Sequence, residues 1–462
     1  MRMFGLDEPE VASLVRAVSG STDADAARST GMDAAGSTGM DAAADAAGSA
    51  AGSAAEGGAE SPASGAPGAG APRIALAERF ARASWTGIAE PGDRTAGALV
   101  AALGAATALR AALGRWDAAE VSRRLAEAGA DPLEEAEWAG AQARWQPRLS
   151  SEPVLTALRQ ARRFGARLLV PGDRLWPVQL NDLGCHAPIA LWVRGTDEAL
   201  AALSRSLALV GARAATGYGE HVTMEASAGL VDRGYAIVSG AAYGIDGMAH
   251  RAALASSGRT IAFLAGGVDR FYPSGHDALL TRIATSGAVV SELPCGSQPT
   301  KWRFLQRNRL IAAGSSATIV LEAGYRSGSL NTAGHAAALG RPLGAVPGPV
   351  TSAASAGCHR LIREFDAVCV TDAEQMAELV PFGARLDDDD RTARTARSTG
   401  RPSEELRVLD ALAARSGRDA DEVAMRSGLA TAQVQAVLGR LQLEGAVREG
   451  ERGWVRAGSV SR

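Results

Sequence analysis

The chain has 462 residues, more than one ordinary domain holds, so two or three domains are expected. Its formal net charge of −3 excludes a globally basic nucleic-acid-binding protein, and any anion site must be a local patch. Every basic residue except Lys301 is an arginine and alanine is in excess, so the arginine content is a compositional bias and a weak sign of binding.

Cysteine spacing and hydropathy exclude two further classes. The four cysteines lie far apart and form no CxxC pair, which predicts reduced core side chains and no metal site. The sequence has no run of 18 apolar residues and no signal-type N-terminus. We therefore expect a cytoplasmic protein that has no membrane partner.

The first 72 residues combine a short helix with a low-complexity segment. PEVASLVRAV, within residues 1–17, has the apolar spacing of a helix. Residues 18–72 consist mainly of Ala, Gly, Ser, Thr, Asp and Pro, lack aromatic residues, and repeat STGMDAA at 29–35 and 37–43. Such a segment cannot bury enough apolar surface to offset the entropy of ordering, so we expect a disordered insert.

Residues 73–150 have the pattern of a small helical module. ALAERFARASW, AGALVAALGAATALRAAL and AAEVSRRLAEAG predict three or four short helices, which EPGD at 90–93 and LG at 103–104 separate. Residues 151–203 are expected to connect this module to the next region. Within this connector, WPVQLNDLGCHAPIALWVRG ends in a predicted strand, IALWVRG.

Residues 204–380 alternate between apolar runs and stretches of helical spacing. The runs are LALVG, AIVSG, TIAFLAGG, AVVSEL, ATIVLEA, PLGAVPG and AVCV. Continuous apolar strands are covered on both faces, and strands that alternate with helices form a parallel sheet. The fold class is therefore predicted to be α/β, a Rossmann-like, doubly wound and mostly parallel sheet.

The C-terminal part of the sequence predicts a linker and a second, smaller domain. Residues 381–402 are polar and are expected to be a linker. Within residues 403–462, SEELRVLDALAARSG, DADEVAMRSGL and TAQVQAVLGRLQLEGAV predict three helices, and VREGERGWVRA predicts a β-wing. This order of elements is typical of a winged helix-turn-helix.

Glycine-rich turns follow four of the predicted strands. They are VGARAATGYG at 210–219, SGAAYGIDGMAH at 239–250, AGGVDRFYPSGH at 265–276 and EAGYRSGSLNTAG at 322–334. Any one turn is also explained as a simple strand-to-helix joint, but four at the carboxyl edge of one sheet indicate an anion site. The dinucleotide fingerprint and the P-loop motif are both absent, so no cofactor is expected.

The second of these turns contains an acid and a histidine. Asp246 and His250 are four residues apart and share one helix face, where they could form an acid–base pair. We expect instead that Asp246 caps the helix and faces the protein, because an acid repels an anion, and that His250 forms a local hydrogen bond. Ser239 and the backbone N–H groups near Gly240 are expected to bind a phosphate.

The segment KWRFLQRNRL, at 301–310, interleaves cations with aromatic rings and contains no acid. Cations bind phosphates and rings stack on bases, so this pattern favours a single-stranded nucleic acid. The alternative is an amphipathic helix with a solvated basic face.

These motifs together resemble the DprA/Smf family of DNA-processing proteins. The similarity runs through VGARAATGYG, VSGAAYGIDGMAHRAAL, TIAFLAGGVDRFYP, RNRLIAAGSSATIVLEA, SGSLNTAGHAAALGRPLGAVPG and SAGCHRLI. WTGIAEPGDRTAGALVAALG resembles the family's sterile-alpha-motif-like (SAM-like) module, and the tail resembles its winged helix. The resemblance implies a homodimer that binds single-stranded DNA during natural transformation, helps to load the RecA recombinase on it, and is not an enzyme.

The resemblance also implies which residues bind DNA. They stand in the turns and in the basic segment, and are Arg213, Ser239, Gly240, Gly266, Gly267, Lys301, Phe304, Arg307, Asn308, Arg309, Ser327, Gly328 and Thr332. The sequence departs from the family pattern at GAAYGID and around Cys358-His359, which puts the last two strands and a dimer contact there in question.

Two other functions stay open at this point. Phosphoribohydrolases use a related sheet with a catalytic acid, and Glu322 stands at a comparable strand end, although their P-G-G-x-G-T-x-x-E arrangement is absent. The near-neutral charge of the tail fits a regulator that contacts protein through the winged helix better than one that binds duplex DNA tightly.

Overall fold

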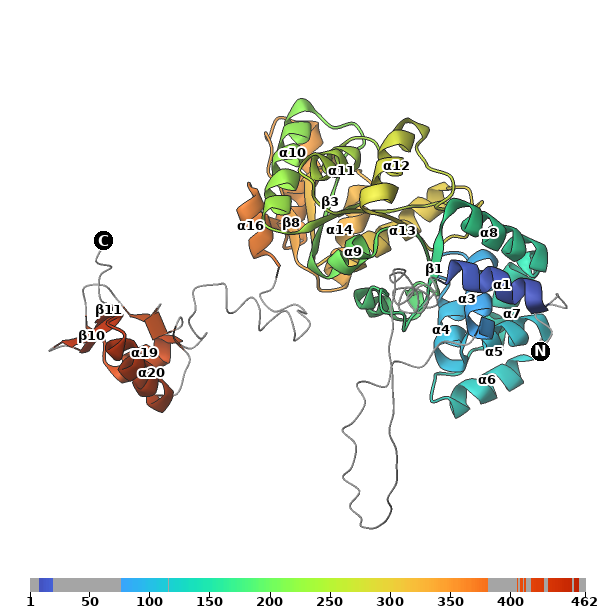
Figure 1. The fold of residues 1–462 in the computed structure, drawn as a ribbon, viewed down its shortest axis with the longest axis horizontal. Coiled ribbons are helices and arrows are strands. Elements are labelled where there is room, and N and C mark those ends of the chain that lie inside the picture. Colours follow the sequence, from blue (N-terminus) through green and yellow to red (C-terminus); the bar gives the residue numbers. More distant parts are fainter. Residues whose placement is uncertain are drawn as a thin grey trace, which may run out of the picture. The chain divides into compact units, whose positions relative to one another are not determined.

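The computed structural model describes residues 8–19, 76–114, 116–380, 405, 408–409, 411–412, 417–427, 431–450 and 453–456. The chain divides into two compact units, residues 1–382 and 383–462, each described by itself (Figure 1). The predicted insert from residue 20 onward and the predicted linker at 381–402 lie outside the described residues.

The N-terminal part of the first unit is helical, as the sequence predicts. Its helices are α1 (Glu8–Val18), α3 (Leu76–Ile88), α4 (Arg94–Leu103), α5 (Ala105–Gly114), α6 (Ala118–Glu127), α7 (Glu135–Trp145) and α8 (Ser151–Phe164), with a 3₁₀ turn η1 (Gln146–Arg148). The α3–α7 module packs around three tryptophans, and the ring centroid of Trp145 lies 4.9 Å from that of Trp85 and 5.9 Å from that of Trp138. Gly104, with φ +77°, separates α4 from α5 at the predicted break.

Helix α1 belongs to the core of the first unit. Val11, Leu14, Val15 and Val18 are all buried, in one apolar cluster with α8 and with the helix α12 (Asp277–Ser286). The predicted insert therefore begins too early at residue 18, because Val18 is a core residue and Ser19 donates a hydrogen bond to Val15 O.

The connector adds two strands at one side of the sheet. They are β1 (Arg167–Leu169), which the sequence analysis did not predict, and β2 (Leu191–Gly195), which it did. Between and after them lie η2 (Val178–His186), α9 (Asp197–Ala201) and η3 (Ala202–Arg205). β1 pairs antiparallel with β2, and β2 pairs antiparallel with β6.

The predicted parallel sheet is confirmed. Its strands are β3 (Ser206–Gly211), β4 (Ala236–Ser239), β5 (Thr260–Phe263), β6 (Ala288–Ser291), β7 (Ala317–Glu322), β8 (Leu343–Ala345) and β9 (Val368–Cys369). The spatial order is β1-β2-β6-β5-β4-β3-β7-β8-β9, and β3 to β9 are parallel to one another. Nearly every residue of β3 to β8 is buried, which is why these strands are continuous apolar runs.

Helices cover both faces of this sheet (Figure 1). The remaining elements are α10 (Gly217–Asp232), α11 (Ile245–Ala255), η4 (Ser274–His276), α13 (Lys301–Ala313), α14 (Ser329–Ala338), η5 (Ala353–Ser355), α15 (Ala356–Glu364) and α16 (Ala373–Glu378). One core lies between the sheet and α10, α11 and α16, and another lies between the sheet and α13, α14 and α15. The chain reverses its direction of travel across the sheet between β3 and β7, and ligands bind beside such a switch point in open α/β folds.

The second unit has the winged-helix elements that the sequence predicts. Its described elements are α19 (Ala420–Ser427), α20 (Thr431–Leu443), β10 (Val447–Gly450) and β11 (Gly453–Arg456). Strands β10 and β11 form an antiparallel wing, and Val408 and Leu412 from the first predicted helix are buried with Val434 and Leu438 of α20.

Within the described residues, no helix on its own is long and apolar enough to span a membrane. Helices α4 and α5 together reach the required length and apolar character, but they are bent by 119° at their break. No group of three or more His, Cys, Asp or Glu side chains in the described chain is arranged to hold a metal ion.

Candidate nucleic-acid interface

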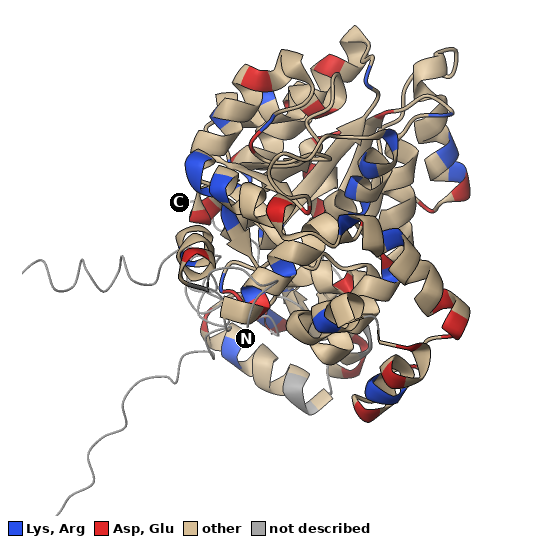
Figure 2. Cartoon of the chain, turned by 90° about the vertical axis from the view of Figure 1, so that its right-hand side faces the viewer, with Lys and Arg blue, Asp and Glu red and all other residues tan. Residues whose placement is uncertain are grey.

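Lys and Arg residues are interspersed with Asp and Glu residues along the chain (Figure 2). This distribution agrees with the low net charge, so an anion site has to be a local cluster. The carboxyl edge of the sheet brings five turns together, after β3, β4, β5, β6 and β7. The candidate interface is built from these turns and from the first two turns of α13.

Three acids of this edge lie inside the protein. Asp246, Glu292 and Glu322 are all buried. Asp246 accepts backbone hydrogen bonds from Gly240 N and Ala242 N at 3.2 and 3.4 Å. Its predicted inward orientation is therefore confirmed, whereas the predicted helix cap is wrong, because Asp246 lies within α11 and accepts its hydrogen bonds from the turn before that helix. Burial raises the pKa of Asp246 and of Glu292, while Arg307 and Arg309 respectively act in the opposite direction.

Glu322 closes the switch point between β3 and β7. Its two carboxylate oxygens accept hydrogen bonds from Thr216 N at 2.9 Å and from Thr216 Oγ1 at 2.6 Å. Gly219 packs so closely on this carboxylate that a Cβ there would overlap it. Glu322 thus stabilises the start of α10, and both of its oxygens are engaged with Thr216.

The cations of the same turns are exposed. Arg213 follows β3, Arg270 follows β5, Lys301 begins α13 and Arg326 follows β7, and all four are exposed. None of the four forms an ion pair with another residue of the described chain. Because these four cations are exposed and unpaired while Asp246, Glu292 and Glu322 are buried, the turns offer a local set of positive charges although the whole chain is weakly negative.

Arg307 is a structural residue rather than a surface cation. It is 6% exposed, and its Nη1 donates to Gly240 O at 2.5 Å and to Phe263 O at 2.7 Å. The guanidinium thereby joins the carboxyl ends of β4 and β5. Burial lowers the pKa of Arg307 to about 10, which Asp246 opposes. A Cβ at Gly240 would overlap this guanidinium, so any larger residue there would have to displace Arg307.

Asn308 and Arg309 are buried as well. Asn308 Nδ2 donates to Asn331 Oδ1 of α14 at 3.2 Å, and its Oδ1 accepts from Arg307 Nε. Arg309 Nη2 donates to both carboxylate oxygens of Glu292 at 2.6 and 2.7 Å. The prediction that these side chains contact DNA directly is therefore corrected for Arg307, Asn308 and Arg309, because α13 turns its second half toward the sheet.

The predicted contacts in the turns after β4 and β5 need the same correction. Ser239 Oγ donates to Leu209 O at 2.7 Å, and Gly240 N–H is used by Asp246. Gly266 and Gly267 are buried beneath the 294–299 loop, where Gly267 N donates to Ser297 O at 3.0 Å. The hydroxyl and the two assigned N–H groups are thus already satisfied within the protein.

The turn after β7 is mixed. Gly328 is exposed at the start of α14, and Ser327 is half-buried, with its hydroxyl 2.7 Å from Ser329 Oγ. Thr332, in the first turn of α14, is buried. Ser327 and Gly328 remain candidates for a phosphate contact, while Thr332 is not accessible for one.

Phe304 lies at the centre of a cluster of cations and rings. Its ring centroid is 5.4 Å from Arg213 Cζ, 5.8 Å from Arg307 Cζ and 5.6 Å from the ring of Tyr272. Phe304 is half-buried, whereas Tyr272 and Arg213 are exposed. The structure thus brings together Arg213 and Phe304, which are 91 positions apart in the sequence.

The helical module holds the start of α13. Glu90, in the loop between α3 and α4, accepts from Arg303 Nε and Nη2 at 3.0 and 2.9 Å, and also pairs with Arg148. Gly92 of the same loop lies against Arg309, where a Cβ would come within 3.0 Å of its Nε. Arg303 is therefore a contact between two parts of the first unit, although it stands in the basic segment.

His250 forms the expected local hydrogen bond, and not one with Asp246. Its Nδ1 lies 2.7 Å from Thr260 Oγ1, and the single hydroxyl proton of Thr260 goes to Ile237 O. Nδ1 is therefore the donor, and Nε2 is buried with no partner in the described structure. Protonation would place an N–H at Nε2 with no acceptor, and burial lowers the pKa of His250 to about 3.

We expect His250 to make the first unit less stable in acid. A histidine whose pKa is lowered in the fold contributes stability above its unfolded pKa of about 6.5, and this is lost as the pH falls toward 3. Between pH 6.5 and 5 the free energy of unfolding should fall by up to about 2 kcal/mol. Urea unfolding at both pH values measures the change. A smaller decrease in His250→Gln supports the assignment, and an equal decrease contradicts it.

The exposed residues of this edge that were not predicted include Arg270, Tyr272, Tyr325 and Arg326. A signal was present, because DRFY at 269–272 and GYRS at 324–327 each place an arginine within two positions of a tyrosine in a turn after a strand. That is the same combination of cation and ring that marked KWRF at 301–304.

Comparison with known proteins agrees with this geometry. Residues 167–381 match the family model for DNA recombination-mediator protein A, and residues 392–451 match the DprA winged helix domain. A putative DNA processing protein DprA from Mycobacterium tuberculosis is 47% identical over 309 residues, which cover 64% of this chain and 79% of the relative. Protein Smf from Escherichia coli is 40% identical over 239 residues, or 51% of this chain and 62% of Smf.

A solved structure shows the same fold. The X-ray structure of DNA processing protein A from Streptococcus pneumoniae has 28% sequence identity and a TM-score of 0.52, and the match covers 66% of this chain and 98% of that chain. This chain thus combines the sheet order, the carboxyl-edge turns and the winged helix with extensive sequence identity to DNA-processing proteins. The chain belongs to the DprA/Smf family.

Proposed function

We propose that the first unit binds single-stranded DNA along the carboxyl edge of its sheet. The observation that carries this proposal is the sorting of charge at that edge, where Asp246, Glu292 and Glu322 are buried and four cations are exposed. The exposed rings beside the cations favour a single strand over a duplex, because only unpaired bases expose their faces for stacking. Arg213, Lys301, Phe304, Ser327 and Gly328 are the predicted residues that remain in this proposal.

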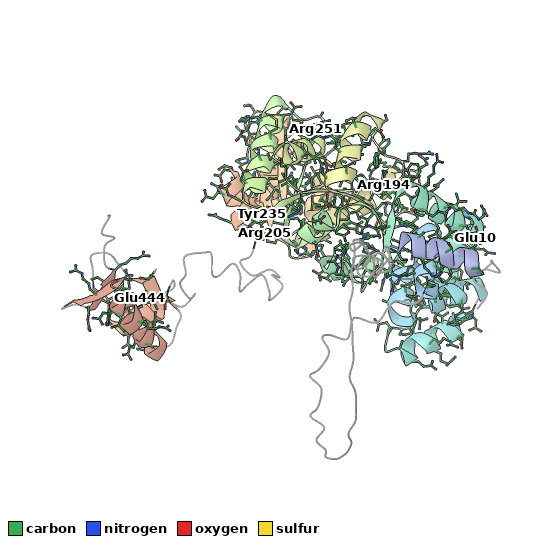
Figure 3. All side chains as sticks on the ribbon, viewed as in Figure 1. Glu10, Arg194, Arg205, Tyr235, Arg251 and Glu444 are labelled. Carbon is green, nitrogen blue, oxygen red and sulfur yellow. The ribbon has the colours of Figure 1, made fainter. Side chains whose placement is uncertain are left out.

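The salt dependence of binding tests the proposal. For the full chain and an oligothymidylate, Arg213→Ala should weaken binding and reduce the slope of log K against log salt by about 0.7, the value for one phosphate contact of a single strand. Lys301→Ala should do the same. Arg251→Ala is the control, since Arg251 is exposed on α11 and forms no ion pair within the described chain (Figure 3). Equal effects of Arg213→Ala and Arg251→Ala would show a general charge effect and no groove.

We propose a binding role rather than catalysis. The phosphoribohydrolase alternative needs a free acid at the end of β7, and both oxygens of Glu322 are hydrogen-bonded to Thr216. An assay for release of free base from nucleoside monophosphates tests this, and release that Glu322→Gln abolishes would contradict it.

We propose further that the bound strand is passed to RecA in the cytoplasm during DNA uptake. Membership of the family and the match to a recombination-mediator model support this step. Assembly of RecA on DNA coated with single-strand-binding protein measures it. The full chain should accelerate assembly, and Arg213→Ala should accelerate it less.

A homodimer through the edge of the sheet is also part of the proposal. β9 is the last strand in the described sheet order, and Val368 is 50% exposed on it beside the exposed Phe365. An apolar edge strand that is not covered can pair with a second copy. Val368→Arg should shift the chain toward monomer in sedimentation velocity, and an unchanged sedimentation coefficient would place the dimer elsewhere.

For the second unit we propose contact with protein rather than with duplex DNA. Arg440 is the only basic residue of α20, the helix that would enter a major groove, and it lies 3.7 Å from Glu405. Leu443 is 91% exposed at the end of the same helix. A chain that ends near Pro381 should therefore keep its single-strand affinity within about tenfold, or 1.4 kcal/mol.

A further inference from the structure

The ring that the sequence singled out for base stacking is already occupied in the structure. Phe304 is half-buried, and two guanidinium groups, those of Arg213 and Arg307, lie within 6 Å of its centroid. Each guanidinium near an aromatic ring is held there by the negative potential of the ring. A base that stacked on Phe304 would compete with these contacts, so Phe304 is better placed to hold Arg213 than to receive a base.

Tyr272 is the neighbouring ring that is free. Its ring centroid lies 5.6 Å from that of Phe304 with an interplanar angle of 52°, and the residue is 53% exposed. No other ring and no cation contacts Tyr272 in the described chain. A tyrosine that is supported at one side and open at the other is a suitable platform for a base.

The loop that carries Tyr272 is fixed from both sides. Phe271 packs against the core and lies 5.2 Å from Arg194 Cζ, whose Nη1 donates to Val268 O. Asp269 Oδ1 accepts from Gly296 N at 2.8 Å, which ties the loop to the segment before α13. The ring is therefore presented by an ordered backbone, and binding has less conformational entropy to overcome.

We propose that Tyr272 is the base-stacking residue of the interface, with Arg213 and Arg270 as phosphate contacts and Phe304 as the ring that supports Arg213 and Tyr272. This inference rests on the proposed function. It names the part of the nucleic acid that the turn after β5 recognises, namely the face of an unpaired base. Because every base has such a face, recognition there is independent of sequence.

The experiment compares two single strands of equal length, an oligothymidylate and an abasic oligodeoxyribose phosphate, with the full chain. Tyr272→Leu should weaken oligothymidylate binding by about 5- to 150-fold, the range for one stacked base, without a change in salt slope. On the abasic strand it should bind like the unmodified protein. Tyr272→Phe, which retains the ring, should bind both strands normally.

Two further variants separate stacking from support. Phe304→Leu should weaken binding to both strands, because it removes the ring that Arg213 contacts. Tyr235→Leu is the matched control, since Tyr235 also lies beside an arginine, with Arg205 Cζ 4.8 Å from its ring, but precedes β4 at the opposite edge of the sheet (Figure 3). It should leave both affinities unchanged.

The outcomes distinguish this inference from the proposed function. If Arg213→Ala weakens oligothymidylate binding while Tyr272→Leu does not, the groove exists and Tyr272 is not its stacking ring. Equal losses for Tyr272→Leu on both strands would also overturn the inference, because they would show a disturbed backbone and not a lost base contact. If the unmodified protein binds neither strand, the proposed function and this inference both fail.

Discussion

Replacing Arg307 with methionine is expected to lower the free energy of unfolding of the first unit by about 3–5 kcal/mol, the usual cost of breaking a buried charged contact. The substitution preserves most of the volume but leaves Gly240 O and Phe263 O without their donor. It also removes the cation beside the buried Asp246. Urea unfolding followed by tryptophan fluorescence measures the change, since every tryptophan except Trp454 precedes residue 383.

Arg213→Ala is the matched control for this prediction. Arg213 is exposed and forms no hydrogen bond within the described chain, so its removal should change stability by no more than about 0.5 kcal/mol. The two variants should therefore have opposite profiles: Arg307→Met loses stability, and Arg213→Ala loses DNA affinity. A stable Arg307→Met protein with a reduced salt slope would show that Arg307 contacts phosphate after all.

Loss of α1 is expected to be the most destabilising truncation at the N-terminus. Leu14 is 3% exposed in the core that α1 shares with α8 and α12, so Leu14→Ala alone should cost about 2–5 kcal/mol. Deleting residues 1–19 removes Val11, Val15 and Val18 as well and should cost more than any single substitution. The change in thermal unfolding temperature of each variant measures the loss.

The control is a deletion within the low-complexity segment. Removing residues 25–70 keeps α1 and leaves residues 19–24 and 71–75 to connect it to α3. This variant should unfold at the temperature of the full chain and bind oligothymidylate equally well. If it unfolds much earlier, the segment contributes to the fold, and if deletion of 1–19 is harmless, α1 does not.

Most strands of the sheet could be predicted because they are buried apolar runs, and glycine-rich turns follow four of them. Strand β1 was missed because Arg167–Leu169 is only three residues long. Helix α7 was not among the predicted segments because its apolar periodicity is weak. Its buried residues are Trp138, Ala141 and Trp145. The break between α4 and α5 was visible as LG at 103–104 because a glycine with positive φ ends α4 there.

The side chains of the proposed interface were harder to predict because exposure depends on packing between distant segments. Lys301 and Arg307 stand in the same short basic stretch, yet Lys301 is exposed and Arg307 is buried, since α13 crosses from the edge of the sheet to its face. No local sequence pattern predicts that α13 crosses from the edge of the sheet to its face. Arg213 and Phe304 come together only because β3 and β6 end at the same edge.

The contact between Glu90 and Arg303 has a consequence for recombining parts of related proteins. The loop that contains Glu90 and Gly92 and the helix that contains Arg303 and Arg309 fit each other by charge and by shape. A chimaera that takes its helical module from one relative and its sheet from another must inherit both partners together. If it inherits one alone, a carboxylate or a guanidinium at the junction loses its counterion, and the helix that begins with Lys301 loses its support.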